Sequence, residues 1–137
     1  MDQIGTETGK LIVKVRTGFG IYPLADVFVT VISEDGENST VVANVFTDEG
    51  GSTGEILLEL PPVTDRLAPR VYNYTVETSK PGYQKVIFHG TEVYPGVTTV
   101  QLINMAALPD MNGVNLDEYD LEVVVNKDGD FGRETVG

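Results

Sequence analysis

The sequence predicts an all-β fold: a seven-stranded, two-sheet sandwich with an extra strand near the C-terminus. Three observations predict it. Apolar and polar residues alternate with the two-residue period of strands, and helical periodicity is almost absent. Turn dipeptides separate the alternating stretches, among them Asp35-Gly36, Pro81-Gly82 and Pro95-Gly96. The 137 residues, of which 41% are hydrophobic, suffice for one domain with a sizeable core.

The expected strands follow in order along the chain. In the first, residues 11–16, the side chains of Leu11, Val13 and Val15 alternate with polar ones, as in a half-buried strand. Pro61-Pro62 ends the fourth strand, because proline cannot donate a hydrogen bond to a β-ladder. The other six strands are residues 27–32, 41–46, 55–60, 71–77, 86–89 and 97–103.

The charge pattern divides the chain. We expect a short arm over residues 1–8, the sandwich over residues 9–108 and an acidic extension over residues 109–137. Of the net charge of −12, half falls on the last 28 residues, which hold two basic and eight acidic side chains. Within the extension, Tyr119, Leu121, Val123 and Val125 share one face of a further strand, near residues 119–125. This strand can fold back onto its own sheet edge or pair with a neighbouring molecule.

Composition excludes several classes of partner. A chain of net charge −12 repels nucleic acid and anionic lipid, so we expect no nucleic-acid partner. No apolar run approaches the ~20 residues that span a membrane, so we expect no membrane insertion. The absence of cysteine excludes disulfides and thiolate sites. The first residues lack the features of a signal peptide, which leaves the localisation open.

Four motifs point to a family. They are Gly9-Lys-Leu-Ile-Val-Lys-Val15, Pro23-Leu-Ala-Asp-Val27, Thr47-Asp-Glu-Gly-Gly51 and Tyr74-Thr-Val-Glu-Thr-Ser-Lys-Pro-Gly-Tyr83. In this order they resemble the carboxypeptidase regulatory-like family of transthyretin-like (prealbumin-like) sandwiches, over residues 9–108. Residues 57–62 and 71–74 are similar to non-catalytic modules of clostridial spore-cortex-lytic and peptidoglycan-binding proteins. The resemblance implies an accessory role without an active site, frequently at bacterial surfaces.

Few residues suggest chemistry. His89 is the only histidine, at the end of an expected strand, and no partner for acid–base catalysis can be placed beside it. Glu55 and Glu59 share a face opposite the apolar residues of their strand, as a solvated face does. We therefore expect no catalytic residue, no cofactor and no enzyme activity.

Two weak binding sites remain. Asn126, Asp128 and Asp130 occupy the first, third and fifth positions of a calcium loop, but Phe131 and Gly137 replace its glycine and its bidentate glutamate. A weak or absent calcium site is the expectation. Asp48 and Glu49 are expected to be turn residues. Aromatic side chains, Tyr72 and Tyr94 foremost, could stack on a glycan, although packing within the sheet is the commoner role.

The functional hypothesis is a non-catalytic structural module that assembles with itself or with another envelope or virion protein. Surface layers, appendages, spores and virions are the settings it fits. The alternative is an accessory module that binds peptidoglycan or another glycan of the cell envelope.

Overall fold

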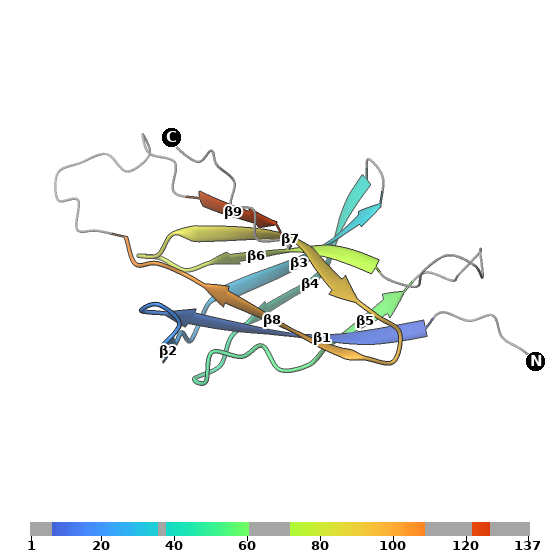
Figure 1. The fold of residues 1–137 in the computed structure, drawn as a ribbon, viewed down its shortest axis with the longest axis horizontal. Helices are drawn as coiled ribbons and strands as arrows, with labels where there is room; N and C mark the ends of the chain where they lie inside the picture. The colour runs from blue at the N-terminus through green and yellow to red at the C-terminus, as the bar shows by residue number, and fades with distance from the viewer. Residues whose placement is uncertain (1–6, 36–37, 61–71, 109–121, 127–137) are drawn as a thin grey trace, which may run out of the picture.

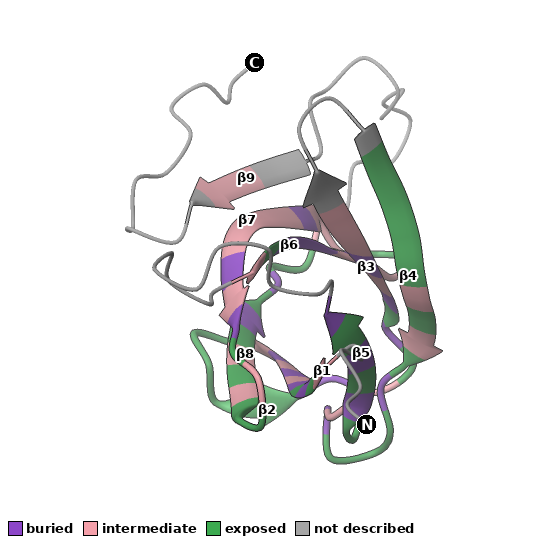
Figure 2. Cartoon of the chain, turned by 90° about the vertical axis from the view of Figure 1, so that its right-hand side faces the viewer, coloured by how far each residue is buried: buried purple, intermediate pink, exposed green. Residues whose placement is uncertain are grey.

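The computed structural model describes residues 7–35, 38–60, 72–108 and 122–126, which form two facing sheets (Figures 1 and 2). The smaller sheet contains β1 (Glu7–Thr17), β2 (Tyr22–Pro23), β5 (Ile56–Leu60) and β8 (Thr98–Asn104). The larger contains β3 (Phe28–Asp35), β4 (Asn38–Phe46), β6 (Tyr72–Ser79), β7 (Lys85–Val93) and β9 (Glu122–Asn126). The predicted all-β sandwich is confirmed, with β2 as an additional short strand.

The order of the strands determines which strands lie at the edges of each sheet. In the smaller sheet β1 pairs with β5 and β2 antiparallel and with β8 parallel. The larger sheet runs β4-β3-β6-β7-β9, antiparallel except for the parallel pair β7 and β9. Within the described residues, β4 is therefore an edge strand of the larger sheet and β5 an edge strand of the smaller one.

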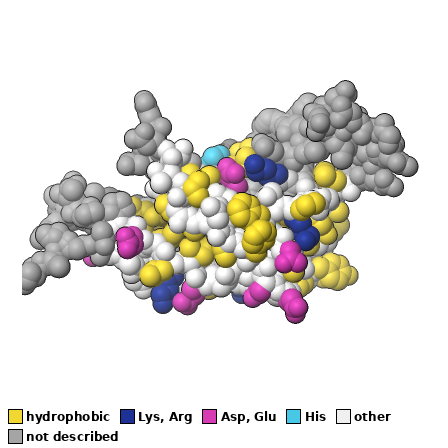
Figure 3. All heavy atoms as spheres, turned by 180° about the vertical axis from the view of Figure 1, so that it is seen from behind, with side chains coloured by type: hydrophobic (Ala, Val, Ile, Leu, Met, Phe, Trp, Pro, Cys, Tyr) yellow, Lys and Arg dark blue, Asp and Glu magenta, His cyan; other side chains and the backbone are white. Residues whose placement is uncertain are grey.

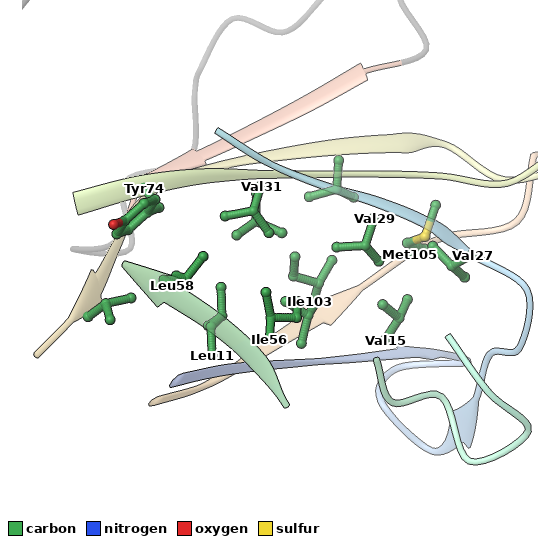
Figure 4. Close-up of a cluster of buried hydrophobic side chains, with 14 of the residues drawn as sticks. Leu11, Val15, Val27, Val29, Val31, Ile56, Leu58, Tyr74, Ile103 and Met105 are labelled. Carbon is green, nitrogen blue, oxygen red and sulfur yellow. The ribbon is translucent and has the colours of Figure 1, made fainter. Parts of the chain in front are cut away.

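The core lies between the sheets, where alternate residues of each strand point inward (Figure 4). The predicted inward face of β1, Leu11, Val13 and Val15, is fully buried. Facing it from the larger sheet are Val29 and Val31 of β3. The remaining buried apolar residues are Leu24, Val27, Ile56, Leu58, Leu60, Tyr74, Val76, Val86, Val93, Ile103 and Met105.

The predicted turns close as their sequences require. Tyr83 N donates to Lys80 O at 3.0 Å, with Gly82 at φ 88°, the positive φ that the third position of a type II turn demands. Gly96 plays the same part at φ 72°. The Asp35-Gly36 signal lies between β3 and β4, which pair antiparallel up to Asp35 and Asn38.

The largest differences from the expected strand boundaries are at the start of β1 and the end of β7. β1 begins at Glu7, which pairs with Leu60, so the last two residues of the expected arm belong to the sheet. β7 continues to Val93, and His89 is therefore not at a strand end, as expected, but within the strand. The reason is Gly90, whose φ of 90° allows the chain to bulge and resume pairing where the register with β6 shifts.

The extra C-terminal strand is β9, where Val123 and Val125 pair with Val86 and Phe88 of the same chain. The Val125 side chain packs against the core. Tyr119 and Leu121, the other two residues predicted for this face, lie outside the described residues.

Thr78 is an exception in the core, because its buried Oγ1 has no hydrogen-bond partner within the described structure. We expect Thr78→Val to raise the free energy of unfolding by about 1 kcal/mol, since a similar shape replaces an unsatisfied hydroxyl. Thermal denaturation measures the change. Thr30→Val is the control: its hydroxyl donates to Asn44 Oδ1 at an exposed position and should give little change. A fall in stability on Thr78→Val would contradict the prediction.

Candidate interaction surface

His89 and Glu55, for which we expect no catalytic role, both form contacts within the fold. His89 is half-buried and shares a hydrogen bond of 2.9 Å between its Nδ1 and Thr75 Oγ1 on the neighbouring strand. Glu55 forms an ion pair with Lys10 at 3.5 Å, and both side chains are exposed. No group of three or more His, Asp or Glu side chains in the described residues could hold a metal ion.

Asp48 is a turn residue, as the sequence indicated. Its Oδ1 accepts hydrogen bonds from the backbone N–H groups of Gly50 at 2.9 Å and Ser52 at 3.0 Å. Of the calcium-loop candidates, only Asn126 is described; its backbone ends β9 opposite His89. Asp128 and Asp130 lie outside the described residues.

The two tyrosines suggested for glycan stacking have different environments. Tyr72 is half-buried and packs against the core. Tyr94 is 40% exposed and donates a hydrogen bond to Glu92 Oε1. Glycan stacking by these two residues stays a prediction.

The two most exposed large apolar side chains of the described residues, Phe19 and Ile21, are instead on the β1–β2 hairpin. Phe19 is 98% exposed, and Ile21 and Tyr22 are 64% and 62% exposed. Phe19 also has a positive φ of 61° between two glycines, Gly18 and Gly20. A bulky residue in this region is strained. We call residues 18–22 the hairpin tip.

The fold holds the hairpin tip in place. Thr17 pairs with Tyr22, and Ile21 N donates to Thr17 O at 3.1 Å. A Cβ on Gly18 would lie 2.7 Å from the Tyr22 ring, so glycine is required for that ring to pack there. The Gly-Phe-Gly sequence was the signal that could have identified a shaped tip.

A second apolar feature lies between the edge strands β4 and β5. A cavity of about 430 Å³ is lined by Val42, Leu57, Leu58, Glu59 and Tyr74. Val42 and Leu57 are 43% and 63% exposed, whereas Leu58 and Tyr74 are buried core residues. Burial raises the pKa of the Tyr74 hydroxyl, and Tyr72 adds to the rise. This β4–β5 cavity therefore reaches from the surface into the core.

The opposite side of the sandwich is closed. There Thr91 Oγ1 donates to Gln101 Oε1 and Thr99 Oγ1 donates to Glu92 O, each at 3.0 Å, and these bonds join β7 to β8.

On the face seen from behind, hydrophobic side chains lie together, with charged groups around them (Figure 3). Strand β4 contains no charged residue, and its Val41 and Phe46 side chains are 53% and 59% exposed.

Known proteins share the fold. No family model and no curated protein matches this chain. Among solved structures, the minor pilin of Streptococcus agalactiae is similar with a TM-score of 0.51 at 16% identity, over 80% of this chain and 49% of that one. The 3-chlorocatechol 1,2-dioxygenase of Rhodococcus opacus gives 0.50 at 15% identity, over 79% and 62%. Transthyretin from Sparus aurata gives 0.41 at 20% identity, over 71% and 90%.

These likenesses concern the fold alone. The chain spans about half the length of the minor pilin, and the similar structures with a TM-score of 0.50 or more include a pilin and an enzyme. One sandwich fold thus serves unrelated functions, and function must be argued from surfaces and sites. The predicted transthyretin-like sandwich is supported at the level of the fold; the closer resemblance to clostridial modules stays a prediction. The described residues include no helix that could cross a membrane.

Proposed function

We propose that this chain is a non-catalytic structural module that assembles with copies of itself in a surface or appendage structure. The observation that carries the proposal is apolar exposure at the hairpin tip and around the β4–β5 cavity. Exposed apolar area of this kind marks interaction sites, because leaving it in water forgoes the free energy of burial. A chain of net charge −12 can approach its own copies most closely where such neutral surface faces the partner.

The setting is part of the proposal. The similarity in fold to a minor pilin supports an appendage or a cell surface as the setting. Spores and virions are alternatives, because assembly through exposed apolar surface fits them as well. The clostridial resemblance of residues 57–62 and 71–74 would favour the cell envelope. Glycan binding is less supported, because Tyr72 packs against the core and Tyr94 alone offers a single exposed ring.

Assembly is testable on the purified chain. We expect the average mass from light scattering to rise with protein concentration, and to rise further with salt, since salt screens the repulsion between chains of charge −12. A constant monomeric mass across micromolar to millimolar concentrations, at low and high salt, would refute self-assembly.

A further inference from the structure

The hairpin tip and the β4–β5 cavity are unexplained by the packing of a single chain. Phe19 combines 98% exposure with a φ of 61°, so its ring gains no burial within the chain that would offset the backbone strain. The cavity leaves Leu58 and Tyr74 beside open space of about 430 Å³. One feature is an apolar projection and the other an apolar recess.

We propose that the hairpin tip of one copy inserts the Phe19 ring into the β4–β5 cavity of a second copy. The inference rests on the proposed function and names its contact. The apolar lining of Val42, Leu57 and Leu58 suits an aromatic ring. A ring seated there would fill the recess beside the core and leave water at the same time.

Charge favours a second copy as the occupant. Arg16 pairs in register with Pro23 at the base of the hairpin, and Glu59 lines the cavity. Neither side chain makes an ion pair within the described residues. Insertion of the tip brings a basic side chain of one copy toward an acidic one of the other. The two surfaces are therefore complementary in charge as well as in shape and polarity.

The two features lie at different ends of the core. Tyr74 and Leu58 lie at one end of the core, and Val15 and Met105 at the other (Figure 4). The hairpin follows Val15 along β1, at the end of the molecule where β2 lies (Figure 1). A chain uses different surfaces to give and to receive the tip, so each bound copy still offers one of each unless the two copies exchange tips reciprocally. Such a contact propagates into a chain of molecules unless its rotation closes a ring.

Two variants test the contact. Phe19→Asn removes the ring while keeping a residue that tolerates positive φ, so the hairpin should fold. Leu57→Asp places a charge at the mouth of the cavity, at a side chain that is 63% exposed. We expect the association constant of each variant alone to fall by about tenfold or more, because each variant loses a central apolar anchor. Sedimentation equilibrium on the full chain measures this, and circular dichroism checks the fold.

Mixing the variants is the decisive step. Phe19→Asn keeps an intact cavity and Leu57→Asp an intact tip, so a mixture should form one-to-one dimers that grow no further. Val100→Ser is the matched control: Val100 is 50% exposed on β8, belongs to neither the hairpin tip nor the cavity lining, and its variant should assemble like the unmodified chain. Exchange of charges is an independent check: Arg16→Glu or Glu59→Arg should each weaken assembly, and the double variant should restore it.

The outcomes separate this inference from the proposed function. If the unmodified chain stays monomeric, both fail. If it assembles and Phe19→Asn assembles equally well, or the mixture forms no dimer, the tip-in-cavity contact is wrong while self-assembly stands. Weak single variants together with a strict dimer in the mixture support the contact.

Discussion

Replacing Gly51 by alanine should lower the free energy of unfolding by about 3 kcal/mol or more, which is the largest effect we expect of a single added carbon. Gly51 has φ 79°, where an L side chain costs roughly 1–2 kcal/mol. Its Cβ would also lie 2.6 Å from Val15 O and 3.1 Å from Leu24 N, both backbone atoms. Neither atom can move without disturbing the hydrogen bond that Leu24 N donates to Val15 O at 3.0 Å. Thermal denaturation should show a midpoint roughly 10 °C lower.

Gly54→Ala separates the two causes. Gly54 has a similar φ of 74°, but nothing lies within 4 Å of where its Cβ would be. Gly54→Ala should therefore cost only the backbone strain, roughly 1–2 kcal/mol. Equal losses in the two variants would show that the close approach to β1 contributes nothing.

Thr47→Val should cost roughly 2–4 kcal/mol, because one buried hydroxyl satisfies two backbone groups. Thr47 Oγ1 donates to Leu24 O at 2.7 Å and accepts from Val27 N at 3.0 Å. The side chain is 3% exposed, so water cannot replace the hydroxyl. Valine keeps the shape and leaves both groups unpaired. Chemical denaturation of the two proteins measures the difference.

The contrast with Thr78→Val makes this prediction specific. Both substitutions remove a buried threonine hydroxyl, but only that of Thr47 has partners. The two variants should therefore change stability in opposite directions. Thr47→Ser, which retains the hydroxyl, should recover most of the loss. A Thr47→Val protein as stable as the parent would mean that Leu24 O and Val27 N find other partners.

Local patterns predicted most of the strands and the Pro-Gly turns, but not the short strand β2 or the full extent of β1 and β7. Alternation in β1 and the Pro81-Gly82 and Pro95-Gly96 dipeptides depend on neighbours a few residues away, and the structure agrees with them. Such patterns do not predict how distant segments pair. The extent of β7 past His89 depends on a bulge at Gly90 that only the register with β6 requires.

The candidate surfaces were less accessible to prediction. The sequence does not distinguish Phe19 and Val42 from buried apolar residues. They are exposed because no other strand packs over them. The β4–β5 cavity joins residues from β4, β5 and β6, whose adjacency is a property of two packed sheets. The glycan reading of Tyr72 was limited for the same reason, since the core-facing side of β6 is known only once the sheets are paired.

The sequence by itself determined an all-β chain, the approximate position of most of its strands and of the Pro-Gly turns, and a strongly acidic net charge, because each depends on composition or on local period. Only the tertiary structure decided which edges stay open, that a strained Phe19 projects from the β1–β2 hairpin, and that β9 lies against β7 of the same chain. Exposure and edge pairing depend on contacts between distant residues, and these form only when the two sheets pack.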